Sequence, residues 1–154
     1  MKNQHKIISE GFVQKCVINH LENQGWSKSL KSAELWEHGV DIKVRNNKFS
    51  RYWLIEAKGD PSKSVKSPGG SRSSSLNSAL GQIITRMHRN GKRAYKYGYK
   101  YGIAFPYSFR SMVIKKIPFD VMDKLNLFIF FVDVNGVVEE IDWKIMRKVS
   151  PNLH

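Results

Sequence analysis

Residues 52–58, "YWLIEAK", constrain the fold most, because they are typical of a buried strand that ends in two opposite charges. Side chains two residues apart on a strand point to the same face of a sheet, so Glu56 and Lys58 are expected side by side. A buried charge is costly unless an ion pair, hydrogen bonds or a metal compensates it. Glu56 and Lys58 therefore either neutralise each other or share a site with something else.

Helix and strand patterns alternate along the rest of the chain. The predicted helices cover residues 6–25, 76–91 and 108–125, the last with a break at Pro118. The predicted strands cover a weak stretch between Trp26 and Trp36, then 39–44, 50–58 and 100–105, and a hairpin at 127–142 around Asn135-Gly136. Residues 59–75, rich in Ser, Pro and Gly, are predicted as a loop. This order predicts an α/β fold with a central mixed β-sheet flanked by helices.

Length and composition narrow the class of protein. A chain of 154 residues is expected to form a single domain, 1–154. The single cysteine, Cys16, excludes an internal disulfide and favours a reducing compartment. The start of the chain has no apolar signal-peptide stretch, and the longest apolar run, 127–132, is too short to cross a bilayer. We therefore expect a soluble cytoplasmic protein without a membrane partner.

The net charge of +13 is the strongest compositional signal, with 26 Lys and Arg against 13 Asp and Glu. Asp60 is the only acidic residue between Lys58 and Lys100. Such an asymmetry indicates a polyanionic partner, chiefly a nucleic acid, and the absence of a basic amphipathic helix argues against a membrane surface. The expected DNA-facing side chains lie in the loop and on the following helix: Lys63, Lys66, Arg72, Arg86 and Arg89. For the two helix arginines, an exposed helix flank is the alternative.

Residues 92–102, "KRAYKYGYKYG", interleave basic residues with tyrosines. This composition can stack nucleic-acid bases and bind phosphates. The alternative is a strand whose tyrosines pack on one face and whose lysines protect an edge.

Asp41 adds a second carboxylate to the strand pair. It lies in the strand that precedes Glu56, and a short turn brings two such strands face to face. Two carboxylates with waters and phosphate oxygens suit Mg²⁺, and a neighbouring ammonium can orient water and neutralise charge on a phosphate. The alternative is a partly exposed cluster of salt bridges at a strand end.

The stretch "GVDIKV…YWLIEAKG" resembles the D-x(n)-(D/E)-x-K signature of the PD-(D/E)XK nuclease superfamily, which has the restriction-endonuclease-like fold. The expected element order over residues 6–106, αβββαβ, agrees with the core of that family, with a C-terminal helix and β-hairpin in the extension 107–154. The resemblance implies that Asp41, Glu56 and the Ala57 carbonyl bind Mg²⁺, for which Mn²⁺ is expected to substitute. It implies that Lys58 is the catalytic lysine.

Two supporting positions also match the family. Many members have an acidic residue on the first helix, matched by Glu10, and some have a glutamine on the helix after the lysine strand, matched by Gln82. A helix-start carboxylate favoured by the helix dipole is the alternative for Glu10, and a solvated helix flank is the alternative for Gln82. Val40 departs from the pattern, because it stands where the family has its name-giving proline. His38 fits a turn better than a proton shuttle.

The resemblance implies a Mg²⁺-dependent DNA endonuclease, active as a homodimer so that both strands can be cut. Restriction-type, junction-resolvase and repair roles stay open. The alternatives are a non-catalytic DNA-binding module that keeps the fold, and an RNA-directed enzyme.

Overall fold

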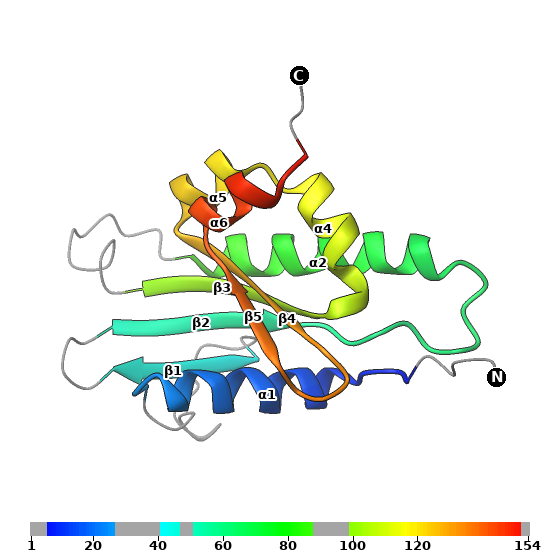
Figure 1. The fold of residues 1–154 in the computed structure, drawn as a ribbon, viewed down its shortest axis with the longest axis horizontal. Coiled ribbons are helices and arrows are strands. Elements are labelled where there is room, and N and C mark those ends of the chain that lie inside the picture. Colours follow the sequence, from blue (N-terminus) through cyan, green and yellow to red (C-terminus); the bar gives the residue numbers. More distant parts are fainter. Residues whose placement is uncertain (1–5, 27–40, 47–50, 88–98, 152–154) are drawn as a thin grey trace.

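The computed structural model describes residues 6–26, 41–46, 51–87 and 99–151, in which a mixed sheet is flanked by helices (Figure 1). This confirms the predicted fold class. The elements along these residues are α1 (Glu10–Asn23), β1 (Ile42–Asn46), β2 (Arg51–Ala57), α2 (Pro68–Arg86), β3 (Tyr99–Pro106), the 3₁₀ turn η2 (Tyr107–Phe109), α4 (Arg110–Lys116), α5 (Phe119–Leu125), β4 (Leu127–Val132), β5 (Val138–Ile141) and α6 (Trp143–Val149).

The described strands form one sheet in the order β1-β2-β3-β4-β5. β1 pairs antiparallel with β2, and β5 pairs antiparallel with β4. β2, β3 and β4 run parallel, which requires long crossover connections. The crossover from β2 to β3 contains α2, and the crossover from β3 to β4 contains α4 and α5. The carboxyl ends of β2 and β3 therefore lie at the same edge of the sheet, beside the start of α1 (Figure 1).

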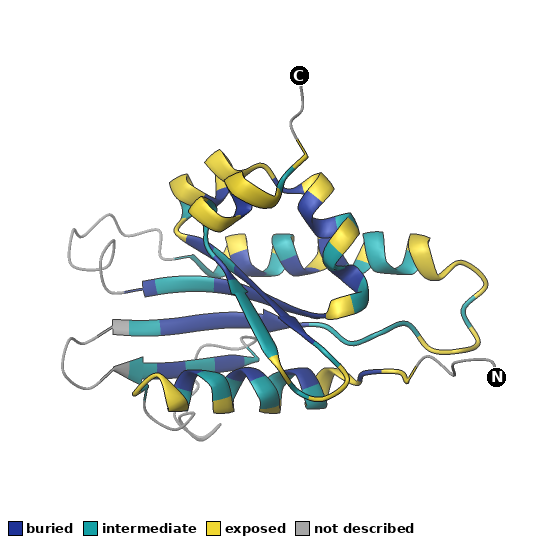
Figure 2. Ribbon diagram, viewed as in Figure 1, coloured by how far each residue is buried: buried dark blue, intermediate teal, exposed yellow. Residues whose placement is uncertain are grey.

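The alternation of side chains along β2 gives each face of the sheet its own core. Trp53, Ile55 and Ala57 pack on the α1 side, whereas Leu54 packs on the side covered by α2. Figure 2 shows the central strands buried between these helical layers. The same alternation places Glu56 on the α2 side.

Two predicted helix starts were wrong. α1 begins at Glu10 rather than at residue 6, because Ser9 accepts a hydrogen bond from the Phe12 nitrogen and caps the helix. α2 begins at Pro68 rather than at residue 76, so the second half of the predicted loop 59–75 is helical. Ser67 caps this helix and proline occupies its first turn, a combination that starts a helix despite the Ser and Gly that follow.

The C-terminal elements largely agree with the sequence. The break at Pro118 separates α4 from α5, and the predicted hairpin forms around Gly136, whose φ is 83°. α6 was not predicted. It is short, and it begins where Asp142 accepts a hydrogen bond from the Ile145 nitrogen.

Some predictions fall outside the described residues, namely the weak strand between Trp26 and Trp36, His38, and the helix beyond residue 87. None of the helices in the described part of the chain has the length and apolar character needed to cross a membrane.

Candidate active site

Four polar side chains from β2 and α2 meet on the α2 side of the sheet. Lys58 donates from Nζ to Glu56 Oε1 at 2.9 Å and to Gln82 Oε1 at 2.7 Å. Arg86 donates from Nη1 to the other carboxylate oxygen, Glu56 Oε2. Gln82 and Arg86 lie one helical turn apart on α2, so one face of this helix reaches the end of β2. The connecting helix α2 thus completes a polar cluster on the face of the sheet that it covers.

Asp41 joins this cluster from the start of β1. Its Oδ2 accepts a hydrogen bond from the Ala57 nitrogen at 2.8 Å, and its Oδ1 accepts none from the residues that the structure describes. The antiparallel register, Ile42 opposite Ile55, brings Asp41 to the level of Glu56. The two carboxylates are therefore neighbours, as the sequence predicts.

The environment of Glu56 is unusual for a charged residue, because only 2% of its surface is exposed. Burial raises the pKa of Glu56, since it disfavours the ionised form, and the nearby charge of Asp41 raises this pKa further. The hydrogen bond and charge of Lys58 and the charge of Arg86 act in the opposite direction. The carboxylate of Glu56 is thus confined between an apolar core and two cations.

The start of α1 is fastened to the end of β2. The Asp60 nitrogen donates to the Ile8 carbonyl at 2.8 Å, and the Ile8 nitrogen donates to Asp60 Oδ2 at 2.9 Å. Ser108 Oγ donates to Asp60 Oδ1 at 2.5 Å. Between these contacts the backbone of Glu10 passes so close to Gly59 that a Cβ there would lie 2.5 Å from the Glu10 nitrogen.

This contact brings Glu10 beside the cluster without making it a member. Its side chain is exposed and accepts a hydrogen bond from Gln14 Nε2 at 3.3 Å. Glu10 also lies in the first turn of α1, where the helix dipole favours a carboxylate.

The cluster offers a metal ion oxygen ligands rather than nitrogen or sulfur ligands. In the described ranges, no group of three or more His, Cys, Asp or Glu side chains is placed to hold a metal. Asp41 and Glu56 supply two carboxylates, and the Ala57 carbonyl follows Glu56 directly at the end of β2. This hard oxygen set fits Mg²⁺, which commonly takes one or two carboxylates and completes its shell with waters and substrate phosphates. Among the described residues, each oxygen of Glu56 accepts one hydrogen bond, from Lys58 or Arg86, so each has a further lone pair for a metal ion.

The predicted DNA-facing residues have different surroundings. Lys63 and Lys66 are exposed on the segment before α2. Arg72 is half-buried, with its guanidinium carbon 5.9 Å from the ring centre of Phe109. Arg86 pairs with Glu56 instead of lying on an open helix flank, and Arg89 is outside the described residues.

The tyrosines of the 92–102 stretch that the structure describes pack on one another. Tyr99 and Tyr101 are stacked with their ring centres 6.4 Å apart, and Tyr99 also stacks on Tyr52 at 5.2 Å. Tyr99 and Tyr101 therefore agree with the alternative interpretation of this stretch, in which the tyrosines pack on one face of a strand. Tyr95 and Tyr97 are outside the described residues.

The sequence did not reveal two members of this region. Arg86 was expected to face DNA, although its spacing of four residues from Gln82 already placed both on one side of a helix. Asp60 was noted only as an isolated acid, and its position two residues after Lys58 was the available signal of its role.

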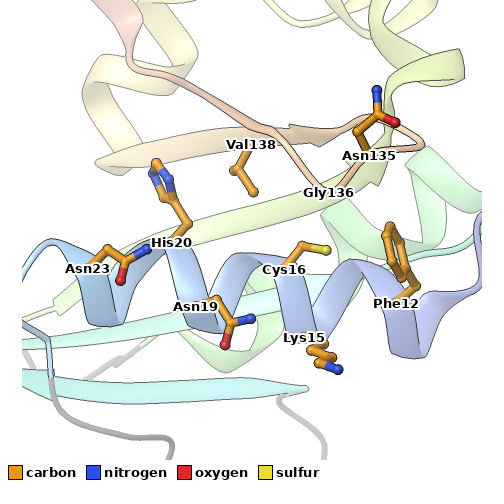
Figure 3. Close-up of a pocket in the computed structure, with 9 residues that line it drawn as sticks. All are labelled: Phe12, Lys15, Cys16, Asn19, His20, Asn23, Asn135, Gly136 and Val138. Atoms are coloured by element: carbon orange, nitrogen blue, oxygen red, sulfur yellow. The ribbon is translucent and has the colours of Figure 1, made fainter.

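Larger cavities lie away from this cluster. One of about 370 Å³ separates α1 from the β4–β5 hairpin, and Figure 3 shows Phe12 and Cys16 on α1 with Asn135 and Gly136 opposite. His20, also on this cavity, forms an ion pair with Glu140 at 2.9 Å. No member of the Asp41–Glu56–Lys58 cluster lines it, so cavity size does not mark the candidate site.

Comparison with solved structures gives a similar fold. The chain is similar to an XisH family protein from Nostoc punctiforme PCC 73102, with 17% sequence identity, a TM-score of 0.51, and coverage of 85% of this chain and 99% of that one. No model of a known protein family matches the chain, and no curated protein matches it. At this identity the likeness shows the fold alone.

Proposed function

We propose that this protein is a Mg²⁺-dependent DNA endonuclease that hydrolyses phosphodiester bonds, of the PD-(D/E)XK type. The observation that carries the proposal is the convergence of Asp41, Glu56 and Lys58 at the end of β2. Glu56 lies on the buried strand β2, Lys58 directly follows it, and the antiparallel partner β1 brings Asp41 to the same level. The XisH family protein of similar fold supports the architecture on which this site depends.

In this proposal the two carboxylates hold the metal and Lys58 acts on the phosphate. Bound Mg²⁺ supplies Lewis acidity, which activates water and neutralises charge on the phosphate. Lys58 has three donors on its ammonium, of which one contacts Glu56 and one contacts Gln82. The third is available for a phosphate oxygen or the attacking water. Gln82 is therefore a positioning residue, because its carbonyl fixes the ammonium from the far side.

Arg86 has two uses in this scheme. Without a metal it neutralises Glu56, which is otherwise a buried anion. If Asp41 and Glu56 held a metal ion, the ion would supply the charge that neutralises Glu56, and the guanidinium of Arg86 would be available to bind a phosphate in a bidentate manner. The Gly59 contact brings the backbone of Glu10 to the end of β2, and in the proposal its exposed carboxylate is a supporting acid at the rim of the site.

The partner in the proposal is DNA, because the net charge of +13 needs a polyanion and Lys63 and Lys66 are exposed beside the site. A homodimer would place one such site on each strand of a DNA duplex. Mn²⁺ is expected to replace Mg²⁺. A cytoplasmic location also belongs to the proposal.

A second candidate function is a non-catalytic DNA-binding module. The observation that favours it is the complete internal pairing of Glu56, whose two oxygens accept from Lys58 and Arg86 while its side chain is only 3% exposed. Such a cluster needs no metal to be satisfied.

A cleavage assay separates the two candidates. Supercoiled, linear and branched DNA are incubated with wild type, Asp41→Asn and Lys58→Met, with Mg²⁺, with Mn²⁺ and with chelator. We expect metal-dependent cleavage by wild type and a loss of at least about 100-fold in each variant. The preferred substrate then distinguishes restriction, resolvase and repair roles, and an RNA substrate tests the RNA-directed alternative.

Matched controls are available on α5. Asp123→Asn and Lys124→Met change the same kinds of charge at exposed positions, and both should cut like wild type. If wild type binds DNA but cuts nothing with either metal, the binding module is the better description. If Asp41→Asn and Lys58→Met cut at the wild-type rate, the proposed site is wrong.

A further inference from the structure

A small cavity of about 170 Å³ lies beside the candidate active site. Its lining combines four parts of the chain: Lys6 before α1, Asp60 and Lys63 after β2, Arg72 on α2, and Ser108 in η2. Asp60 follows Lys58 by two residues, so their Cα atoms are at most about 7 Å apart. The cavity therefore borders the chain segment that directly follows Lys58.

The charge of this cavity is positive. Lys6, Lys63 and Arg72 contribute three cations, against one carboxylate from Asp60. Lys6 and Lys63 are exposed and form no ion pair with any described residue. An anion entering the cavity would consequently meet cations that are not already neutralised.

The single carboxylate has a structural task. Both oxygens of Asp60 accept hydrogen bonds, from the Ile8 nitrogen and from Ser108 Oγ, and these bonds fasten the start of α1 to the sheet. Two donors already stabilise its negative charge, which reduces its repulsion of an incoming anion.

Arg72 supplies a second signal that a ligand is missing. Its Nε is buried and has no hydrogen-bond partner among the described residues. A buried donor usually has an acceptor. Arg72 lines the cavity, so a small rotation of its guanidinium would let an anion bound there accept from this nitrogen.

Size and charge together indicate the class of ligand. The cavity is smaller than the roughly 300–1,000 Å³ of sites for whole drug-sized molecules, so it suits a single small group. Arginine and lysine both bind phosphate well. Pro68, the first residue of α2, also lines the cavity, which adds the positive end of a helix dipole at its rim.

We propose that the Lys6–Lys63–Arg72 pocket binds a phosphate group of the DNA strand, next to the phosphate held at Lys58. This subsite rests on the proposed function for its ligand, and it deepens that function by fixing the path of the strand past the active site. The phosphate is either internal to the strand or a terminal one. A terminal phosphate would favour ends as substrates.

Binding measured without metal tests the subsite separately from cleavage. Fluorescence anisotropy with chelator present gives the affinity for single-stranded oligonucleotides that carry a 5′-phosphate, a 3′-phosphate or neither. Lys6→Gln and Lys63→Gln should each weaken binding and lower the salt slope by about 0.7, the value for one phosphate contact to a single strand. Lys148→Gln, an exposed lysine on α6, is the matched control and should keep the wild-type slope.

A second measurement guards against indirect effects. Inorganic phosphate titrated into ¹⁵N-labelled wild type should shift the amide signals of Ser62, Lys63 and Ser108, and the shifts should be lost in Lys63→Gln. A preference for one phosphorylated end identifies a terminal phosphate, whereas equal affinities identify an internal one. The subsite is refuted if the three lysine variants lose affinity equally, or if none does. That result would leave the proposed cleavage activity unaffected. Conversely, a protein that binds phosphate in this pocket but cuts no DNA would contradict the cleavage proposal and leave the subsite proposal intact.

Discussion

Gly59 and Glu10 touch through their backbones, and a Cβ on Gly59 would lie 2.5 Å from the Glu10 nitrogen and 3.1 Å from the Ser9 carbonyl carbon. The atoms in the way are main-chain atoms of a capped helix start, which cannot move aside as a flexible side chain can. This contact sets the distance between the first helix and the lysine strand. A hydrogen at position 59 is therefore a condition for placing Glu10 near Lys58.

Gly59→Ala should destabilise the protein by about 1–3 kcal/mol, because the added methyl group forces the start of α1 away from the sheet. Urea unfolding measures the change. Gly81→Ala is the control, since a Cβ at this exposed helical position meets nothing within 4 Å. It should stabilise the protein by about 0.5–1 kcal/mol through helix propensity. Equal effects of the two substitutions would show that the Gly59 contact is not tight.

Arg86→Met removes one of the two cations that neutralise a buried carboxylate. We expect a loss of about 1.5–3 kcal/mol, the range for a hydrogen bond to a charged group, because Lys58 still pairs with Glu56. Chemical denaturation measures the loss, and a double-mutant cycle with Glu56→Gln isolates the pair. Arg147→Met, an exposed arginine on α6, should change stability by less than about 0.5 kcal/mol. Similar losses in both arginine variants would contradict the buried ion pair.

The raised pKa of Glu56 predicts a particular pH dependence. Between its ordinary value of 4.5 and the raised value, the folded protein holds a proton that the unfolded chain has released. The contribution of Glu56 to the free energy of unfolding is therefore full below pH 4.5 and falls as the pH rises through the raised pKa. Wild type should lose stability relative to Glu56→Gln over this window, as urea titrations from pH 4 upward can measure. A gain relative to the variant would mean that Lys58 and Arg86 outweigh burial.

Cys16 offers an independent test of local electrostatics. Burial raises the pKa of its thiol above 9.0, and Asp133 adds to this, while Lys15 opposes it. The pH midpoint for alkylation by iodoacetamide should therefore lie higher in the folded protein than in the urea-unfolded chain. Because Cys16 is the single cysteine, the mass of the intact chain reports its modification. A midpoint at or below that of the unfolded chain would refute the prediction.

The convergence of Asp41, Glu56 and Lys58 was accessible from sequence because it depends on two simple periodicities. Alternation along a strand places Glu56 and Lys58 together, and a short turn aligns the preceding strand with them. Gln82 followed from the family pattern on the next helix. Glu56 and Gln82 lie on regular elements, and Asp41 and Lys58 directly adjoin the ends of strands, so the sequence already implies their directions.

The features that the sequence did not predict depend on how the helices and strands are oriented against each other. Whether Arg86 faces DNA or Glu56 is set by the roll of α2 over the sheet, which apolar spacing fixes only coarsely. The early start of α2 was hidden because its Ser and Gly residues suggest a loop, whereas the cap by Ser67 and the following Pro68 decide otherwise. The contact of Gly59 with Glu10 joins distant segments, and no local pattern encodes it.

The crossover between parallel strands has a consequence for how the chain reaches its native state. Glu56 lies on the face of the sheet that α2 covers. Its carboxylate has both cationic partners in place only after α2 has docked, because Arg86 lies on α2 and Gln82 of the same helix holds Lys58. If α2 docked one turn out of register, it would carry Arg86 away and leave a desolvated anion with half its compensation, at a cost that few mispacked states can tolerate. The carboxylate that we propose as a metal ligand would thus also disfavour a wrongly docked α2 during folding.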